Sequence, residues 1–246
     1  VAIFILGAII GSFLNVCIYR IPDGVSIVSP RSRCPQCETM IKWYHNIPIL
    51  SWLLLKGKCA YCGVAVPIRY LLVEALTGTL FALFFFRFSF HPVTPVVLLL
   101  VAALVVITFI DLDHQIIPDV ISLPGIPIGF LCSFLVPWVT WQESLLGIVF
   151  GGGSLLVIAL GYEFLTKKEG MGLGDVKLLA MLGAFLGWTA IFPIIFIGSL
   201  LGTLVGIPLM LIKKADSKLA VPFGPFLSAA ALIHIFFIQH FDPIMR

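Results

Sequence analysis

Long apolar runs alternate with short polar segments over most of this chain. Crossing the roughly 30 Å hydrocarbon core of a bilayer takes a helix of about 20 predominantly apolar residues. The predicted spans are Val1–Tyr19, Leu71–Phe88, Val93–Ile110, Val120–Val136, Leu145–Leu165, two halves of Val176–Ile212 divided near Pro193, and Phe226–Phe241. The pattern therefore predicts an all-α polytopic membrane protein with about eight transmembrane helices.

The chain begins at Val1 and not at a methionine, which is consistent with missing first residues. Its first apolar run lacks a small-residue cleavage site, so we interpret the run as a span and not as a signal peptide. Gly7, Gly11 and Ser12 lie on nearly one face of that helix. Small residues on one face predict that a neighbouring helix approaches closely there.

Composition agrees with a membrane location. Hydrophobic residues make up 60% of the chain and charged residues only 11%, with a mean hydropathy of +1.13. Soluble domains carry about 25% charged residues. The net charge of +3 is small, and the basic residues do not alternate with aromatic residues along a stripe. We therefore expect the lipid bilayer, and no nucleic acid, as a partner.

Residues 20–69 form the longest polar segment and hold seven of the 15 Lys and Arg residues. Four cysteines lie there in two CxxC pairs, Cys34 with Cys37 and Cys59 with Cys62, separated by 21 residues. Such pairs can place four thiolates at the corners of a tetrahedron, the geometry preferred by structural zinc. In a reducing compartment this spacing favours metal over the alternative of disulfides or redox pairs. We predict a small cytoplasmic insert stabilised by zinc.

Charge placement predicts the topology. With the N-terminus outside, 13 basic residues fall on the cytoplasmic side and only Arg87 and Arg246 outside, as the positive-inside rule requires. The cytoplasmic residues are Arg20, Arg31, Arg33, Lys42, Lys56, Lys58, Arg69, Lys167, Lys168, Lys177, Lys213, Lys214 and Lys218. The predicted location is a cytoplasmic membrane, with the cysteine insert facing the cytoplasm.

Two acidic patches fall on the same predicted side as the cysteines. Asp111 follows the third apolar run, and Asp175 ends the sequence Gly-Leu-Gly-Asp at the start of the sixth. Carboxylates near membrane depth are costly and usually functional. Two aspartates that share a proton can hydrolyse a peptide bond. Because residues two apart on a helix do not face each other, Asp175, and not Asp113, is the natural partner of Asp111.

Other residues support this site or have simpler explanations. Gly172 and Gly174 remove side chains beside Asp175, which lets a substrate backbone approach. We interpret Asp113, Asp119 and Lys177 as solvated or hydrogen-bonded groups at helix ends. Acidic groups such as Asp113 and Asp119 also attract a basic peptide.

Glu74 lies one turn inside the second span and has two interpretations. It is either an ion-pair partner of a basic loop residue or a functional group. It is our one candidate for cofactor binding. The resulting domains are a first transmembrane helix (1–19), a four-cysteine loop domain (20–69) and a transmembrane aspartyl peptidase bundle (70–246).

Taken together, these motifs resemble the bacterial type IV prepilin peptidases, membrane aspartyl proteases with a GxGD motif. The matching segments are Gly11–Val16, Tyr19-Arg20, Pro22, the two CxxC pairs, Asn46–Pro48, Ser51-Trp52, Arg69-Tyr70, Glu74, Thr77-Gly78, Asp111, Pro118-Asp119 and Gly172–Lys177. Arg69-Tyr70-Leu71 departs from the proline that often follows the tyrosine.

The resemblance implies an endopeptidase that removes the basic leader of type IV prepilins or pseudopilins at the cytoplasmic membrane face. It matches Asp111 and Asp175 to the catalytic aspartates. It also implies methylation of the new N-terminal residue with S-adenosylmethionine as cofactor, although no glycine motif of soluble methyltransferases is present. Two alternatives remain open: a zinc-stabilised transporter or channel that uses intramembrane carboxylates, and a non-catalytic membrane adaptor.

Overall fold

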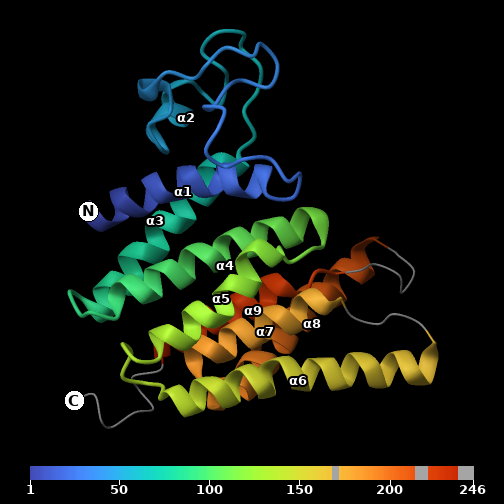
Figure 1. The fold of residues 1–246 in the computed structure, drawn as a ribbon. Coiled ribbons are helices and arrows are strands. Elements are labelled where there is room, and N and C mark those ends of the chain that lie inside the picture. The colour runs from blue at the N-terminus through green and yellow to red at the C-terminus, as the bar shows by residue number, and fades with distance from the viewer. Residues whose placement is uncertain (168–171, 214–220, 238–246) are drawn as a thin grey trace. The chain divides into compact units, whose positions relative to one another are not determined.

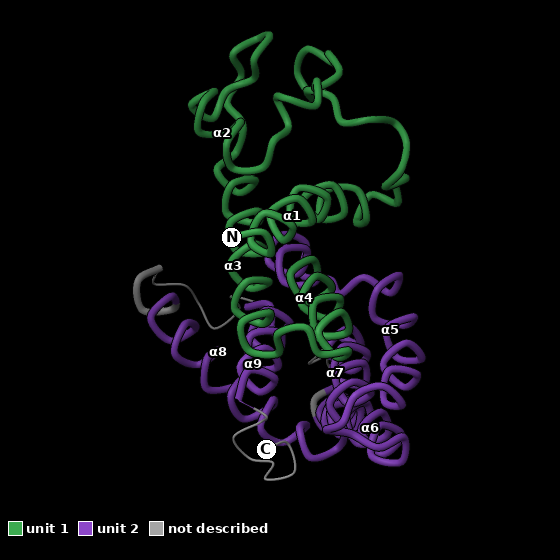
Figure 2. Tube along the Cα trace, turned by 90° about the vertical axis from the view of Figure 1, so that its left-hand side faces the viewer, with its two compact units in different colours: residues 1–106 green, residues 107–246 purple. Residues whose placement is uncertain are grey.

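The computed structural model describes residues 1–167, 172–213 and 221–237. The chain divides into two compact units, residues 1–106 and 107–246 (Figure 2). In chain order the helices are α1 (Ala2–Arg20), η1 (Trp43–His45), α2 (Leu50–Leu54), α3 (Arg69–Phe88), α4 (Thr94–His114), α5 (Asp119–Cys132), α6 (Trp141–Thr166), α7 (Leu173–Leu186), η2 (Trp188–Ala190), α8 (Ile191–Lys213) and α9 (Gly224–Phe237) (Figure 1).

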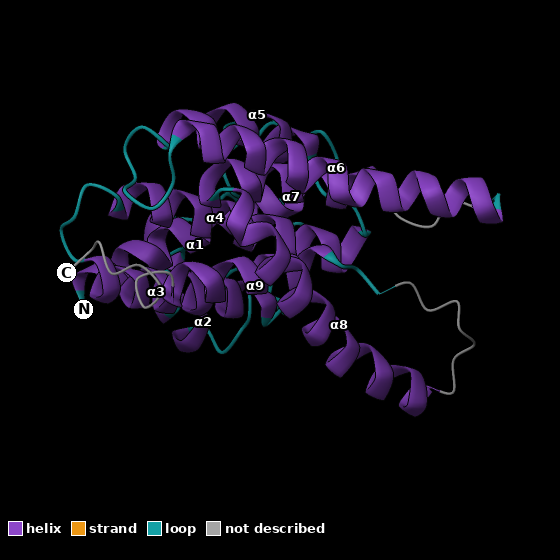
Figure 3. Cartoon of the chain, turned by 90° about the horizontal axis from the view of Figure 1, so that it is seen from below, coloured by secondary structure: helices purple, strands orange, loops and turns teal. Residues whose placement is uncertain are grey.

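The fold is helical, as predicted. Over the described ranges the structure contains no strand, only two isolated bridges, Arg33 with Met40 and Lys58 with Ala65 (Figure 3). Five of the described helices, α1, α3, α4, α6 and α8, are long and apolar enough to cross a bilayer. The other three predicted spans correspond to α5, α7 and α9. Their 14 described residues each amount to about 21 Å of helix, which is shorter than the bilayer core.

In the first unit, α1 and α3 pack closely through small residues. A Cβ added to Gly7 would lie 2.8 Å from the Cα of Gly78, and one added to Gly11 would lie 2.9 Å from the Cα of Glu74. Only glycine allows two helix backbones to approach this closely. The close approach predicted at Gly7 and Gly11 is therefore confirmed, and α3 is the neighbouring helix.

The segment between α1 and α3 is not polar throughout. No lysine, arginine or acidic residue lies between Lys42 and Lys56. The stretch contains η1 and α2, and α2 exposes Leu50, Leu53 and Leu54. Side-chain hydrogen bonds hold this stretch in place. The Ser51 hydroxyl donates to the carbonyl of Tyr44 and accepts from the N–H of Ile47, and the Trp52 indole donates to the carbonyl of Val66.

In the second unit, α7 is the central helix. Every residue from Leu178 to Leu186 is buried. Gly147 of α6 contacts the backbone of Gly183 directly, and Gly125 of α5 lies against the side chain of Met181. The sequence of a helix that is enclosed on several sides is apolar all round. This explains why the sequence around α7 resembles a membrane span although the helix is short.

The boundary between α7 and α8 differs from the predicted break at Pro193. The chain turns at Gly187, whose φ is +80°, a left-handed conformation that glycine adopts without steric cost. Pro193 lies in the first turn of α8 instead, where a proline removes no helical hydrogen bond. The fourth predicted span also ends early, at Cys132 and not at Val136. Pro118 separates α4 from α5.

Some predictions concern residues outside the described ranges. They are the placements of Lys168, Lys214, Lys218 and Arg246, and the end of the last predicted span at Phe241.

Candidate active site and metal centre

The four predicted cysteine ligands come together. Their sulfur atoms all lie within 4.8 Å of one another, and the Cys34 and Cys62 sulfurs are 3.8 Å apart. A tetrahedral ion with metal–sulfur bonds of about 2.3 Å needs sulfur atoms about 3.8 Å apart. The donor set and its spacing therefore fit a tetrahedral metal ion.

The two CxxC pairs form matching loops. The Cys34 N–H donates to the carbonyl of Thr39, and the Cys59 N–H donates to the carbonyl of Val64, five residues on in both cases. In each loop the fourth residue after the first cysteine, Glu38 or Gly63, has a positive φ and donates its N–H back to that cysteine. The repeated geometry turns both thiols of a pair toward one point.

Hydrogen bonds favour the thiolate, the form that binds metal, at two of the four cysteines. Bonds from the side chain and backbone of Thr39 lower the pKa of the Cys37 thiol to about 6, and backbone bonds from Cys62 and Tyr61 lower the pKa of the Cys59 thiol. At Cys62 a backbone bond from Val64 lowers the pKa, but burial and bonds with the other three cysteines outweigh it and raise the pKa to about 12.

Asp111 lies near the end of α4, within the second unit, and only 5% of its surface is exposed. Its Oδ2 accepts a hydrogen bond of 2.9 Å from the backbone N–H of Gly224, the first residue of α9. A Cβ at Gly224 would lie 2.6 Å from that oxygen. Gly224 is thus a glycine because the Asp111 carboxylate occupies the space that a side chain would need.

Asp175 lies in the first turn of α7 and is half-buried. A shared neighbour, Ile117, links the segments that carry the two aspartates, because its side chain lies 3.1 Å from a Cβ built on Gly174 and 3.2 Å from one built on Gly224. The structure therefore gathers the end of α4 and the first turns of α7 and α9 around Ile117.

The two glycines of the Gly-Leu-Gly-Asp motif have different surroundings. Gly174 packs against Ile117, whereas among the described residues a Cβ on Gly172 would have only the N atom of Gly174 within 4 Å, at 3.9 Å. Gly172 is exposed.

The remaining predicted residues near Asp175 are Lys177, Asp119 and Asp113. The Lys177 ammonium forms a salt bridge with Asp119, with nitrogen to oxygen distances of 2.7 and 2.9 Å, and joins α7 to α5. Asp113 is exposed, two residues beyond Asp111 on the same helix.

Glu74 is placed in the first unit. It is 7% exposed, and its Oε2 accepts a 2.6 Å hydrogen bond from the backbone N–H of Ile49. The Ser12 hydroxyl is a second hydrogen-bonding partner. Glu74 thus connects α3, α1 and the segment before α2.

Sequence reasoning missed Gly224, Ile117 and Ile49 as contributors to these sites. The Pro-Phe-Gly-Pro sequence at 222–225 was a visible signal, but it indicates only a turn. Nothing local in the sequence connects it with Asp111, 113 residues away.

The structure is all-helical and has candidate membrane spans. It holds a buried aspartate, a second aspartate at the start of a neighbouring helix, and a cluster of four cysteines. These features indicate a membrane protein with a candidate hydrolytic site. Comparison with protein families is specific. Residues 5–88 match the bacterial peptidase A24 N-terminal domain, and residues 98–207 match the type IV leader peptidase family. The chain belongs to the type IV leader peptidase family.

Several relatives are named prepilin leader peptidase/N-methyltransferase. The protein from Neisseria gonorrhoeae is 39% identical over 93% of this chain and 87% of its own length. The one from Pseudomonas aeruginosa is 36% identical over the same shares. The one from Myxococcus xanthus is 43% identical over 86% of this chain, but the match spans only 63% of that relative. No solved structure matches the chain.

Proposed function

We propose that this chain is an aspartyl endopeptidase of the bacterial cytoplasmic membrane that cleaves the basic leader from type IV prepilins or pseudopilins. The observation that carries the proposal is the gathering of Asp111 and Asp175 from separate helices, with the Gly224 N–H directed at Asp111. The printed names of the relatives support the same activity.

The proposed chemistry needs the two carboxyl groups to meet at the substrate. Two carboxylates in contact disfavour double ionisation, so such a pair holds one proton. The ionised aspartate takes a proton from water, whose oxygen attacks the scissile carbonyl. The protonated aspartate donates to the carbonyl oxygen. As the C–N bond breaks, the first aspartate passes the proton from water to the departing amine, and a hydroxyl of the intermediate returns a proton to the second aspartate. The Gly224 N–H fixes the orientation of Asp111 throughout.

The four-cysteine cluster is proposed to hold zinc in a purely structural role. All four tetrahedral positions would be filled by Cys34, Cys37, Cys59 and Cys62, which leaves no position for water or substrate. We place this cluster and both aspartates on the cytoplasmic side, because basic residues are concentrated in the loops next to them.

Methylation of the new N-terminus is the second proposed activity, and it rests on the relatives' names. S-adenosylmethionine supplies an electrophilic methyl group when bound. That methyl group would be transferred to the amine nitrogen, which would give up one proton.

A cleavage assay in detergent tests the peptidase proposal with a prepilin substrate. Asp111→Asn and Asp175→Asn should each lower the rate by about 10²–10⁴-fold or more, because each removes one proton-transfer group. Glu163→Gln, which neutralises an exposed acid on α6, is the matched control and should cleave normally. Wild-type cleavage by either aspartate variant would assign the chemistry elsewhere, with Asp113 and Asp119 as the next candidates.

A further inference from the structure

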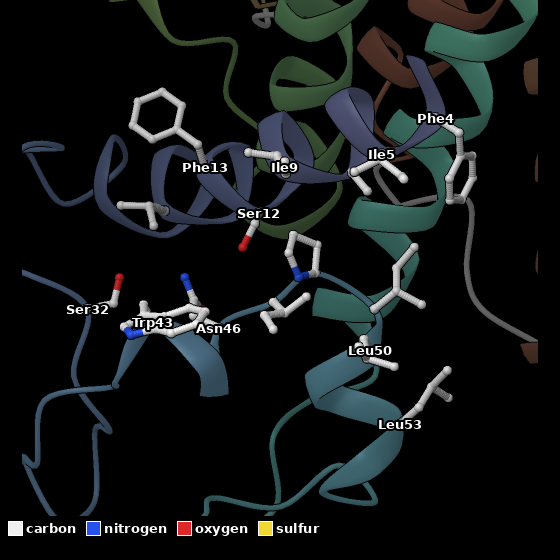
Figure 4. A pocket seen from close by; sticks show the side chains of 15 residues that line it. Phe4, Ile5, Ile9, Ser12, Phe13, Ser32, Trp43, Asn46, Leu50 and Leu53 are labelled. Carbon is white, nitrogen blue, oxygen red and sulfur yellow. The ribbon is translucent and has the colours of Figure 1, made fainter. Parts of the chain in front are cut away.

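One stretch of the cysteine insert, residues 43–55, contains no lysine, arginine or acidic residue and takes no part in the proposed peptide hydrolysis. It includes η1 and α2, and a cavity of about 730 Å³ lies between it and α1, within the first unit (Figure 4). A mainly apolar stretch of roughly 10–14 residues is too short to cross a bilayer. It is typical of a helix buried in a protein core, or of a segment that enters a membrane and leaves on the same side.

The apolar side chains of this stretch are not buried in a core. Leu54 is 72% exposed, and Leu50 and Leu53 on the same short helix are exposed as well. At the other end of the stretch, Trp43 is 77% exposed. A contiguous exposed apolar patch marks a surface that meets a membrane or another protein. The exposure therefore excludes a core helix and favours a contact outside the chain.

The cavity connects this stretch to a membrane span. α1 is long and apolar enough to cross a bilayer, and its Ile5, Ile9 and Phe13 side chains are exposed. The same three residues line the cavity together with Leu50 and Leu53 (Figure 4). Exposed apolar side chains of a membrane span contact lipid, so lipid that covers this side of α1 also reaches α2.

The non-helical backbone just before α2 does not need water for its hydrogen bonds. The N–H of Ile47 donates to the Ser51 hydroxyl, and the N–H of Ile49 donates to Oε2 of Glu74. Pro48, between them, has no N–H. Within a bilayer, backbone polar groups must be satisfied by the protein itself. Glu74 thus gives the Ile49 N–H a partner that lipid could not provide.

Exposed lysines flank the stretch on both sides. Lys42 precedes it, and Lys56 and Lys58 follow it. Lysine side chains near a membrane lay their apolar stems along apolar surface and keep their ammonium groups at headgroup level. Trp43 and Tyr44 are of the residue types that prefer the same level. The order lysine, aromatic pair, leucines, lysine suits a segment that enters and leaves through one membrane surface.

We propose that residues 43–55 insert into the cytoplasmic leaflet of the bilayer beside α1, that phospholipid acyl chains fill the cavity, and that this stretch anchors the cysteine insert to the membrane. The proposal rests on the proposed cytoplasmic side of the insert and on neither enzymatic activity. Its failure would therefore leave the peptidase proposal intact.

Tryptophan fluorescence of the full-length protein in vesicles of phosphatidylcholine and phosphatidylglycerol tests the proposal. Two quenchers are compared, iodide in the water and phosphatidylcholine with bromine atoms on its acyl chains. Leu54→Trp should add emission of which brominated lipid quenches about half and iodide little, because the apolar face of such a segment lies roughly 5–10 Å into the acyl boundary. Gln36→Trp, at an exposed position of the first CxxC loop, is the matched control and should show the reverse.

A second measurement needs only a conservative change. Trp43→Phe removes one native tryptophan and keeps an aromatic ring at that position. The emission that disappears with Trp43 should belong to the part that brominated lipid quenches in the wild type. Metal content and prepilin cleavage are measured on every variant, and both should remain at wild-type levels.

Quenching of the Leu54→Trp emission by iodide and not by brominated lipid would overturn the proposal and place the stretch in water. Quenching by neither would also overturn it, since a protein partner or a second copy of the chain would then cover the stretch. If Leu54→Trp loses its metal, the emission of Trp43 decides between the same outcomes.

Discussion

Two buried carboxylates, Glu74 in the first unit and Asp111 in the second, are held in similar ways and have different neighbours. Each accepts a backbone N–H from a distant segment, Ile49 for Glu74 and Gly224 for Asp111. Near Asp111, the Ile117 side chain lies against Gly224 and against Gly174, the residue before a second acid, Asp175, whereas Glu74 has the hydroxyl of Ser12 and, beyond it, a cavity. Two acids that meet can share and exchange a proton, while a single acid bound to an amide and a hydroxyl can only hold those groups in place. The neighbour, more than the acid, determines the chemistry.

The largest effect in this comparison is expected from Gly224→Ala. The new Cβ would lie 2.6 Å from the Asp111 carboxylate oxygen, so the carboxylate and its backbone donor must separate. We expect prepilin cleavage to fall by about 10²-fold, because misplacement of a catalytic group by about 1 Å has that cost. The lipid contact of residues 43–55 in the first unit should be unchanged.

Gly161→Ala is the control for this substitution, since no atom of the described residues lies within 4 Å of a Cβ at that position of α6. Kinetics and a thermal melt on both variants separate misplacement from unfolding. A Gly224→Ala protein that cleaves at the Gly161→Ala rate would show that the Gly224 N–H is not needed to orient Asp111.

Removal of the metal should come next in size and should affect the first unit more. Cys34→Ser, or treatment with a chelator, would remove the ion that we propose the four cysteines bind. A segment this small has little core of its own, so both CxxC loops should lose their order. We expect an added protease to cut within residues 20–69 more than about 10-fold faster, which metal analysis and limited proteolysis can measure together.

The difference between the two units is the informative quantity here. Prepilin cleavage should change by a smaller factor than proteolysis of the insert, because both aspartates lie in the second unit. Cys132→Ser, a cysteine outside the cluster, serves as the control. Equal factors would show that the metal supports the active site as well as the insert.

The two sites also differ in how far the sequence predicts them. The cysteine cluster was predictable because each CxxC loop is a local structure and its spacing suits one ion. The aspartate pair is a prediction from chemistry, since Asp111 ends one apolar run and Asp175 begins another, at positions where carboxylates are costly. The hydrogen bond from Gly224 was not predictable, because it joins residues 113 apart and only the packing of α4 and α9 determines it.

Helix boundaries, like the hydrogen bond from Gly224, are only partly predictable from the sequence. Pro193 was a reasonable break in an uninterrupted apolar run, but proline is also favourable in the first turn of a helix. The glycine with a positive φ at Gly187 ends α7 instead. The cavity lies still further beyond sequence reasoning, since it depends on an apolar stretch of a mainly polar insert folding against α1.

Gly11→Ala should have a moderate effect that is confined to the first unit. Its Cβ would lie 2.9 Å from the Cα of Glu74, so α1 and α3 must move apart beside the carboxylate. Overpacking of this kind costs about 1–3 kcal/mol. A lower melting temperature with normal prepilin cleavage is the expected result, measured beside Gly161→Ala. Reduced cleavage at an unchanged melting temperature would mean that Glu74 contributes to the chemistry and does not only hold Ile49 in place.

The smallest effect is expected at the salt bridge between Lys177 and Asp119, whose side chains are 30% and 56% exposed. Pairs with this exposure contribute at most about 1 kcal/mol, because water and salt screen them. A double-mutant cycle of Lys177→Met and Asp119→Asn, with unfolding and cleavage measured at low and high salt, should give a coupling in that range that decreases with salt. The bridge joins the first turns of α5 and α7, next to Asp175. Coupling well above about 1 kcal/mol in cleavage alone would therefore mean that the pair positions Asp175, and that the second unit orients both of its acids and not only Asp111.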